Sequence, residues 1–386
     1  MTRDFDRITV AGLRERGGLN WATYPDALGS FVAEMDFGCA PEIIDALHSG
    51  VDSLRFGYLP PVLVADMAQT CADWLARNYD WAVAASDVRP VGDVIAGFEI
   101  AIEHFSRPGS AVVVPTPAYK HFLDVPPRLG RKVVEVAMVL VEERWQFDLD
   151  GLDRAFSAGA GLLVLCSPYN PLGRVFRREE LRAVSEVVER HGAAVFADEI
   201  HCPIVLSGAT HVPYATVSPT AAEHSLTGLS ASKAWNLAGL KCAQMVLTSE
   251  AARETWAALG LAPGIGTSNL GLVANAAAYR FGGAWLEGVL AYLDRNRTRL
   301  GELVTERLPG VVYRPPEGTY LAWLDCMSLN LGDRPGDFFA EHAGVVFTEG
   351  ADCGDAGRGC VRLNLATPQP LLDQVVDRMA DALAAR

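Results

Sequence analysis

Between about residues 90 and 250, short apolar runs alternate with amphipathic stretches along the chain. Each run is long enough for a strand that is buried on both faces, and Gly, Pro or Ser bounds it. One of the stretches between them, 179–191, places Leu181, Val184 and Val187 on one helical face before Gly192 ends the helix. Strands that alternate with helices predict an α/β fold with a mostly parallel central sheet. The predicted strands are 111–114, 132–136, 162–166, 193–197, 225–229 and 243–247.

After Gly283 the pattern changes. A long helical pattern covers 285–308, strand-like runs follow at 319–324 and 361–365, and an amphipathic helix closes the chain at 371–383. This predicts a second, smaller α+β domain. With 386 residues, the chain is long enough for two domains. We expect a large domain over 48–284, a small domain over 285–386, and an N-terminal arm, 1–47, that contributes to the small domain.

The charge balance excludes several kinds of partner. The chain has 47 acidic and 33 basic residues, which gives a net charge of −14. Such a field repels phosphate backbones and anionic lipid, so neither nucleic acid nor a membrane surface is an expected partner. No uncharged apolar run approaches the ~20 residues that a membrane span needs. Residues 1–25 are charged and lack the apolar core of a signal peptide, so we expect a cytoplasmic protein.

Cysteine and lysine usage narrow the chemistry. The eight cysteines never form a C-x-x-C pair, and most lie in apolar strings, so the spacing predicts neither a metal site nor a disulfide framework. The chain has four lysines, Lys120, Lys132, Lys233 and Lys241. Any reaction that needs a lysine amine must therefore use one of these four.

Polar residues follow four of the predicted strands. They are Thr116–Tyr119, Ser167–Gly173, Asp198–His201 and Ser230–Lys233. Ligands of parallel sheets bind beyond the carboxyl ends of the strands, and a carboxylate placed there needs a cationic or hydrogen-bonding partner. Each segment alone could be a helix cap, a packing residue or a turn. Four at one edge of a sheet predict a site.

The same segments carry a family resemblance that runs nearly end to end. The chain contains FVAEMDFGCAPEIIDAL, FGYLPP, TPAY, SPYNPLGRVF, ADEIHCPIVL, HVPYA, SASKAWNLAGLK, AWLEGVLAYLDRNR, GTYLAWLD and VRLNLATP. With these strings it resembles the fold-type I pyridoxal-phosphate enzymes of the class I/II aminotransferase superfamily. Within that superfamily it looks like the cystathionine β-lyase, or C–S lyase, branch. The resemblance implies a three-layer α/β fold and pyridoxal 5′-phosphate as the cofactor.

Roles at the cofactor ring follow from the resemblance. Lys233 matches the lysine that forms a Schiff base with the cofactor aldehyde, and Lys241, eight residues later, is the runner-up amine. Asp198 is expected to pair with the pyridine nitrogen. Asn170 and His201 fall where relatives hydrogen-bond the ring hydroxyl, although His201 could instead be a buried core histidine.

The resemblance also assigns residues to the cofactor phosphate. Asp93 and Val94 open a predicted helix over 94–105, whose N-terminal N–H groups favour an anion. Relatives prefer glycine where Asp93 stands, so we expect its side chain to point away from the phosphate. Ser230 and Ser232 would add hydroxyl groups, and Lys241 would be a basic neighbour.

Three further residues complete the implied site. Tyr119 is expected to stack on the pyridine ring. Tyr58 matches a tyrosine that reaches the phosphate of the neighbouring subunit, which implies a homodimer with two shared active sites. Arg362 matches the arginine that binds the substrate α-carboxylate through a bidentate fork, although it could be one more surface arginine.

The leading hypothesis is β-elimination from cystathionine or another cysteine S-conjugate, which yields a thiol, pyruvate and ammonia. Lys233 would remove the Cα proton as a general base. An aminotransferase that acts on an amino acid and a 2-oxo acid would share the same residues. A cofactor-bearing binding or regulatory protein is a third hypothesis. Tyr169, Glu34 and the pair 60–61 differ from commoner relatives near the expected pocket, which leaves the thioether open.

Overall fold

The computed structural model describes residues 5–386, so the first four residues of the predicted N-terminal arm lie outside the described part of the chain. Within residues 5–386, seven strands form the central sheet, and only β10 runs antiparallel to its neighbours. The predicted mostly parallel sheet is confirmed, and each of the six predicted apolar runs forms one of its strands. In spatial order the seven strands of the sheet are β2 (Val88–Val91), β10 (Ala243–Leu247), β9 (Ser225–Leu229), β8 (Ala194–Asp198), β7 (Leu162–Cys166), β3 (Val112–Thr116) and β4 (Val133–Ala137).

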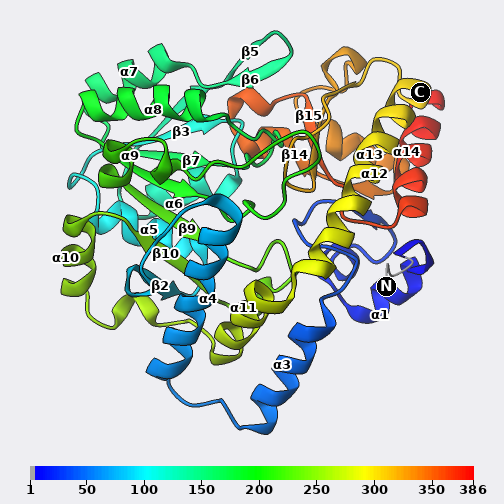
Figure 1. Ribbon diagram of the computed structural model, residues 1–386. Coiled ribbons are helices and arrows are strands. Elements are labelled where there is room, and N and C mark those ends of the chain that lie inside the picture. Colours follow the sequence, from blue (N-terminus) through cyan, green and yellow to red (C-terminus); the bar gives the residue numbers. More distant parts are fainter. Residues whose placement is uncertain (1–4) are drawn as a thin grey trace.

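Helices cover this sheet (Figure 1). Strands β3, β7, β9 and β10 are buried along their whole length. Because successive side chains of a strand point to opposite faces, both faces of the sheet must be covered. The helices of this part are α4 (Pro61–Tyr79), α5 (Val94–His104), α6 (Lys120–Arg128), α7 (Leu149–Ser157), α8 (Arg178–Arg190), α9 (Pro219–His224), α10 (Glu250–Ala258) and α11 (Asn269–Phe281).

A smaller antiparallel sheet lies in the C-terminal part of the chain, as the sequence pattern predicts. Its strands, in spatial order, are β11 (Val312–Tyr313), β12 (Leu321–Asp325), β15 (Cys360–Asn364) and β14 (Thr348–Glu349). The helices of this part are α12 (Gly283–Arg307), α13 (Pro335–Ala343) and α14 (Gln369–Ala384). Helix α12 runs diagonally across the molecule from α11 to the side of α14 (Figure 1).

The N-terminal segment joins the C-terminal part. Strand β1 (Leu28–Gly29) pairs in parallel with β13 (Val345–Val346), and the first helix, α1 (Val10–Arg16), lies on the same side of the molecule as the C-terminal helix α14 (Figure 1). The limits of the two domains stay a prediction. The remaining elements are α2 (Leu19–Ala22), α3 (Pro41–Asp52) and the hairpin of β5 (Val139–Val141) and β6 (Arg144–Gln146).

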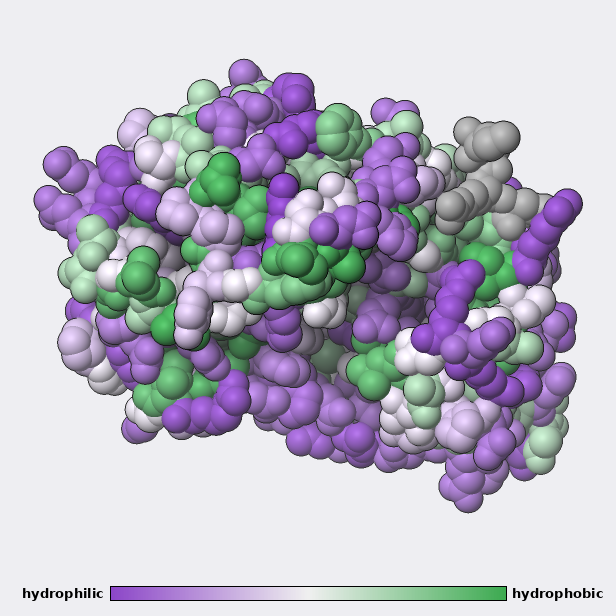
Figure 2. Space-filling view, turned by 90° about the horizontal axis from the view of Figure 1, so that it is seen from below, coloured by the Kyte–Doolittle hydropathy of each residue, from purple (hydrophilic) through white to green (hydrophobic). Residues whose placement is uncertain are grey.

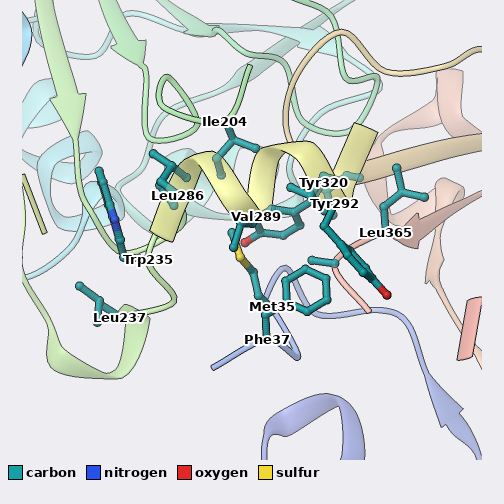
Figure 3. Close-up of a cluster of buried hydrophobic side chains, with 14 of the residues drawn as sticks. Met35, Phe37, Ile204, Trp235, Leu237, Leu286, Val289, Tyr292, Tyr320 and Leu365 are labelled. Carbon is teal, nitrogen blue, oxygen red and sulfur yellow. The ribbon is translucent and has the colours of Figure 1, made fainter. Parts of the chain in front are cut away.

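A buried apolar cluster around α12 brings distant segments together (Figure 3). In this cluster Met35 and Phe37 of the N-terminal segment, Trp235 of the loop after β9, and Tyr320 before β12 lie along the stretch of α12 that contains Val289. All five side chains are buried. Packing of this kind places the residues beside Met35 against the residues beside Trp235, and these include the predicted active-site lysine.

Candidate active site

The carboxyl ends of four parallel strands bring the predicted ring residues to one edge of the central sheet. Tyr119 follows β3, Asn170 follows β7, Asp198 ends β8 and Lys233 follows β9. The charges at this edge influence one another: Arg362, Glu34 and Asp198 all act on the Lys233 ammonium. The small sheet supplies Arg362 from β15.

Lys233 reaches the N-terminal segment. Its Nζ donates a hydrogen bond to the backbone carbonyl of Ala33 at 3.0 Å. Removal from water, together with the nearby Arg362 guanidinium, lowers the pKa of Lys233 to about 8, although Glu34 and Asp198 oppose both effects. At pH 7 a minority of these amines, about a tenth, is therefore unprotonated and nucleophilic.

Asp198 is buried with few donors. Its Oδ1 accepts a hydrogen bond from the Ile200 N–H at 3.1 Å, and its Oδ2 is contacted by the Cys166 Sγ at 4.0 Å. Burial raises the pKa of Asp198 to about 7, even though the Ile200 N–H and the Lys233 charge lower it. One carboxylate oxygen thus lacks a strong donor.

Arg362 links the two sheets. Its Nη1 donates to Asn170 Oδ1 at 3.0 Å, and its Nη2 donates to the Phe31 carbonyl at 2.6 Å and to Thr348 Oγ1 at 3.0 Å. The Arg362 Nε is buried and has no hydrogen-bond partner among residues 5–386. Burial also lowers the pKa of this guanidinium. Its contacts show that Arg362 is not a surface arginine.

His201 lies at the same edge, with its ring 5.9 Å from the ring of Tyr320. Burial, together with the Lys233 and Arg362 charges, holds the pKa of His201 well below its usual value, so the imidazole is neutral. Its Nδ1 is buried and has no partner within the described chain. A neutral ring nitrogen in this state can exchange a hydrogen bond with a ligand.

Two of the predicted phosphate residues, Asp93 and Lys241, meet at the start of α5. Asp93 is the N-cap of this helix, and its carboxylate pairs with Lys241 at 2.8 Å. Val94 is buried. Ser230 Oγ donates to the Cys242 carbonyl at 2.7 Å and accepts from the Ser232 N–H at 3.0 Å. The Ser230 hydroxyl therefore braces the loop after β9.

Tyr119 and Tyr58 lie in different surroundings. Tyr119 is half-buried, and burial raises its pKa while the charges of Arg362 and Asp198 act on it in opposite directions. Tyr58 is fully exposed, and it lines a groove between the α3–α4 connection and 261–270 rather than the edge that holds Lys233. Figure 2 views the molecule from the side of this connection, and hydrophobic residues gather there in patches among polar ones.

Residues of the N-terminal segment and of the small sheet contact Lys233 and Arg362, and the sequence did not predict them. The Ala33 carbonyl accepts hydrogen bonds from both Lys233 and the Tyr320 hydroxyl, the latter at 2.9 Å. Thr348 and the Phe31 carbonyl hold Arg362. The strings AEMDF and GTYLAWLD contain Ala33 and Tyr320, so the signal was present, but nothing in it indicates a contact with Lys233.

These residues fit pyridoxal 5′-phosphate. A buried carboxylate whose raised pKa reflects a missing partner suits a pyridine nitrogen, and a desolvated lysine amine suits an aldehyde. A helix N-terminus beside a lysine suits a phosphate. Of residues 5–386, no group of three or more His, Cys, Asp or Glu side chains is placed to hold a metal ion.

A mostly parallel sheet that presents this lysine and this aspartate at one edge defines a fold-type I pyridoxal-phosphate enzyme. The chain belongs to the aminotransferase class I and II family, whose description matches residues 32–379. It is 36% identical over 372 residues to the cystathionine β-lyase of Corynebacterium glutamicum, and the matched region covers 96% of this chain and 98% of that protein.

Solved structures agree with this assignment. Cystalysin from Treponema denticola, which contains pyridoxal 5′-phosphate, superimposes with a TM-score of 0.91 at 26% identity, over 98% of both chains. The C–S lyase from Staphylococcus hominis, bound to the same cofactor, gives the same TM-score, identity and coverage. The predicted family, cofactor and lyase-type class of enzyme are confirmed. Curated aminotransferases match at lower identity.

Two predictions from composition can be compared with the described residues. Seven of the eight cysteines are buried, and Cys39 is half-buried. Within residues 5–386 we find no helix with the length and apolar character that crossing a membrane requires.

Proposed function

We propose that this chain is a carbon–sulfur lyase that releases a thiol from Cβ of an amino-acid thioether, with pyruvate and ammonia as the other products. One observation carries the proposal: a desolvated lysine and an under-hydrogen-bonded buried aspartate act on each other at a single sheet edge. Relatives named cystathionine β-lyase and C–S lyase support the reaction type. When bound, pyridoxal phosphate supplies an aldehyde that links to an amine and a ring that withdraws electrons from the substrate Cα.

Lys233 acts as the general base in this proposal. Its Nζ takes the proton from the substrate Cα, which requires an unprotonated amine. The lowered pKa of about 8 supplies that form near neutral pH. The hydrogen bond to the Ala33 carbonyl holds the amine at the end of an otherwise flexible side chain.

Asp198 holds a proton on the pyridine nitrogen. Its Oδ2 has the room to accept an N–H hydrogen bond, and a cationic partner would return its pKa toward the usual value. Asn170 and the neutral His201 would hydrogen-bond the ring hydroxyl, and Tyr119 would cover the ring face. Val94, Ser230, Ser232 and the N-terminus of α5 would surround the phosphate.

Arg362 binds the substrate α-carboxylate. Its guanidinium is buried, and its unpartnered Nε lies beside an Nη group, so the planar fork can donate hydrogen bonds to two carboxylate oxygens. The present Nη contacts to Asn170, Phe31 and Thr348 keep the fork in one orientation. Preorganisation of this kind lowers the entropic cost of binding.

A product assay tests the reaction. The holoenzyme is supplied with cystathionine or an S-alkyl cysteine and no 2-oxo acid, and thiol, pyruvate and ammonia are measured. We expect equal amounts of the three, because a thiolate is a good leaving group with a conjugate acid of pKa near 8.5. A single half-reaction that releases no thiol and restarts when a 2-oxo acid is added would instead identify an aminotransferase.

The proposal includes a homodimer with shared sites. Tyr58 is fully exposed, and Phe56, Leu261 and Ile265, which line the same groove, are also exposed. A second copy of the chain would cover this apolar surface and bring Tyr58 to the partner's phosphate. A cytoplasmic location also stays a prediction.

Mixing two inactive variants tests the shared site. Tyr58→Phe would be paired with Lys233→Ala, since a mixed dimer carries one intact site and recovers part of the activity. Subunit exchange is followed independently with differently tagged chains. If exchange is complete and no activity returns, the partner subunit does not supply Tyr58.

A further inference from the structure

The side chain of Asp93 does not point away from the expected phosphate position, although its departure from glycine suggests that it would: its carboxylate lies at the start of α5. Asp93 has an extended backbone, with φ of −158°, and is the N-cap of α5. Its Oδ1 accepts a hydrogen bond from the Ala96 N–H at 2.8 Å, and its Oδ2 pairs with Lys241 Nζ at 2.8 Å. Asp93 therefore uses a helix-terminal N–H and the nearest lysine at once.

These two groups are the ones that an incoming phosphate would use. A helix N-terminus and a lysine each favour an anion, and in this chain a carboxylate already neutralises both. Partial burial raises the pKa of Asp93, but the Lys241 ammonium and the Ala96 N–H outweigh it and leave that pKa below its usual value. Asp93 is consequently ionised at neutral pH.

A second observation shows that the Asp93 charge is felt within the site. Burial is the main reason for the raised pKa of Tyr119; the Arg362 guanidinium lowers that pKa, and the carboxylates of Asp198 and, to a smaller extent, Asp93 raise it. The Asp93 charge thus acts on the same tyrosine as the residues assigned to the ring and to the substrate. It does not face only bulk solvent.

We propose that Asp93 is a built-in competitor of the cofactor phosphate. It satisfies Lys241 and the start of α5 when the phosphate is absent, and it repels the phosphate when the cofactor binds. The holoenzyme therefore releases its cofactor more readily than the remaining site residues alone would allow. The inference rests on the proposed function, since it takes the phosphate to bind at this helix.

The test is cofactor affinity rather than activity. Asp93→Asn and Asp93→Ser both keep an N-cap acceptor and remove the charge. Dissociation constants for pyridoxal 5′-phosphate and for pyridoxal, which lacks the phosphate, are measured by absorbance titration of the full-length apoenzyme. Asp148→Asn is the matched control, because Asp148 caps α7 through Gly151 N–H at 2.9 Å and pairs with Arg154 at 3.3 Å.

We expect both Asp93 variants to bind pyridoxal phosphate about tenfold more tightly than the parent chain, from the loss of one like charge beside the phosphate. Their affinity for pyridoxal and the affinity of Asp148→Asn for either compound should stay within about twofold. If the Asn and Ser variants bind pyridoxal 5′-phosphate with unchanged or weaker affinity, the inference is overturned, and the role of Asp93 is to position Lys241. If the parent chain does not bind pyridoxal phosphate at all, the proposed function itself fails.

Discussion

Two neighbouring acidic residues, Asp198 at the end of β8 and Glu199 directly after it, differ in their hydrogen bonds, and only Glu199 has both carboxylate oxygens paired. Glu199 is fully buried, and its Oε1 accepts from the Tyr214 N–H at 2.6 Å while its Oε2 lies 3.2 Å from His211 Nε2. Asp198, one residue earlier, has one N–H donor, at 3.1 Å. A shift of one position along the chain therefore separates two different hydrogen-bonding environments.

The difference separates a structural carboxylate from a functional one. A buried acid that only supports the fold is stable when both of its oxygens are paired. An acid that must receive a ligand keeps an open position, and the fold tolerates the resulting cost, which is visible in the pKa of Asp198 at about 7. A substitution of Asp198 should therefore affect the chemistry more than the stability of the protein.

Removal of the Lys233 amine should have the largest effect on activity. Lys233→Ala is expected to lower turnover by about a thousandfold or more, since it deletes both the cofactor linkage and the general base. Borohydride reduction and peptide mapping of the parent enzyme should place the pyridoxyl group on Lys233. Lys120→Ala, which removes an exposed lysine paired with Asp124, is the control and should retain the parent activity. A pyridoxyl group on Lys241 would contradict the assignment.

Asp198→Asn should separate activity from stability. We expect turnover to fall by at least about a hundredfold, because an amide cannot hold the pyridinium proton. The apoenzyme should become more stable at pH 8, by roughly 2 kcal/mol, because the variant no longer buries an unpaired carboxylate.

The pH dependence gives the sign of this effect. Folding raises the pKa of Asp198 from 3.8 to about 7, so between these values the folded chain holds a proton that the unfolded chain has lost. The free energy of unfolding of the apoenzyme should therefore fall as pH rises from about 4 to 7, and less so in Asp198→Asn. Denaturant titrations at several pH values measure this; parallel pH profiles, or near-normal turnover of the variant, would refute the role.

A substitution of Glu199 should instead affect stability more than activity. Glu199→Gln is expected to lower the free energy of unfolding by about 2–3 kcal/mol, since it weakens charge-assisted hydrogen bonds in a dry site. Turnover per folded holoenzyme should change little. His211→Gln and the double variant complete a mutant cycle, and strict additivity of the two losses would mean that the pair is not coupled.

The smallest expected effect is that of substituting Arg362, whose guanidinium is proposed to bind the substrate α-carboxylate. Arg362→Lys should raise KM for the amino-acid substrate about tenfold, because lysine keeps the charge but loses one of two parallel hydrogen bonds. Cofactor affinity should stay nearly constant. Arg358→Lys, a change at an exposed arginine paired with Asp333 and Asp355, is the control. A KM equal to that of the parent enzyme would place the carboxylate elsewhere.

Local pattern was sufficient for much of the large sheet. The runs at 162–166 and 225–229 coincide with β7 and β9, and the helical pattern at 285–308 lies within two residues of α12 at each end. Residues that follow a strand in sequence must also follow it in space, so the strand-end segments were placed correctly at one edge. Apolar periodicity and chain connectivity are short-range properties, which a sequence states directly.

By itself, then, the sequence determined the class of fold, the family and the strand ends that carry the lysine and the aspartate. Only the tertiary structure decided that β10 runs antiparallel, that Ala33 holds Lys233 from 200 residues away, and that Arg362 reaches Phe31 across 331 residues. It also decided that Asp198 is left open while Glu199 is saturated. A backbone carbonyl carries no sequence signature, and the burial and pairing of a side chain depend on every segment that packs around it.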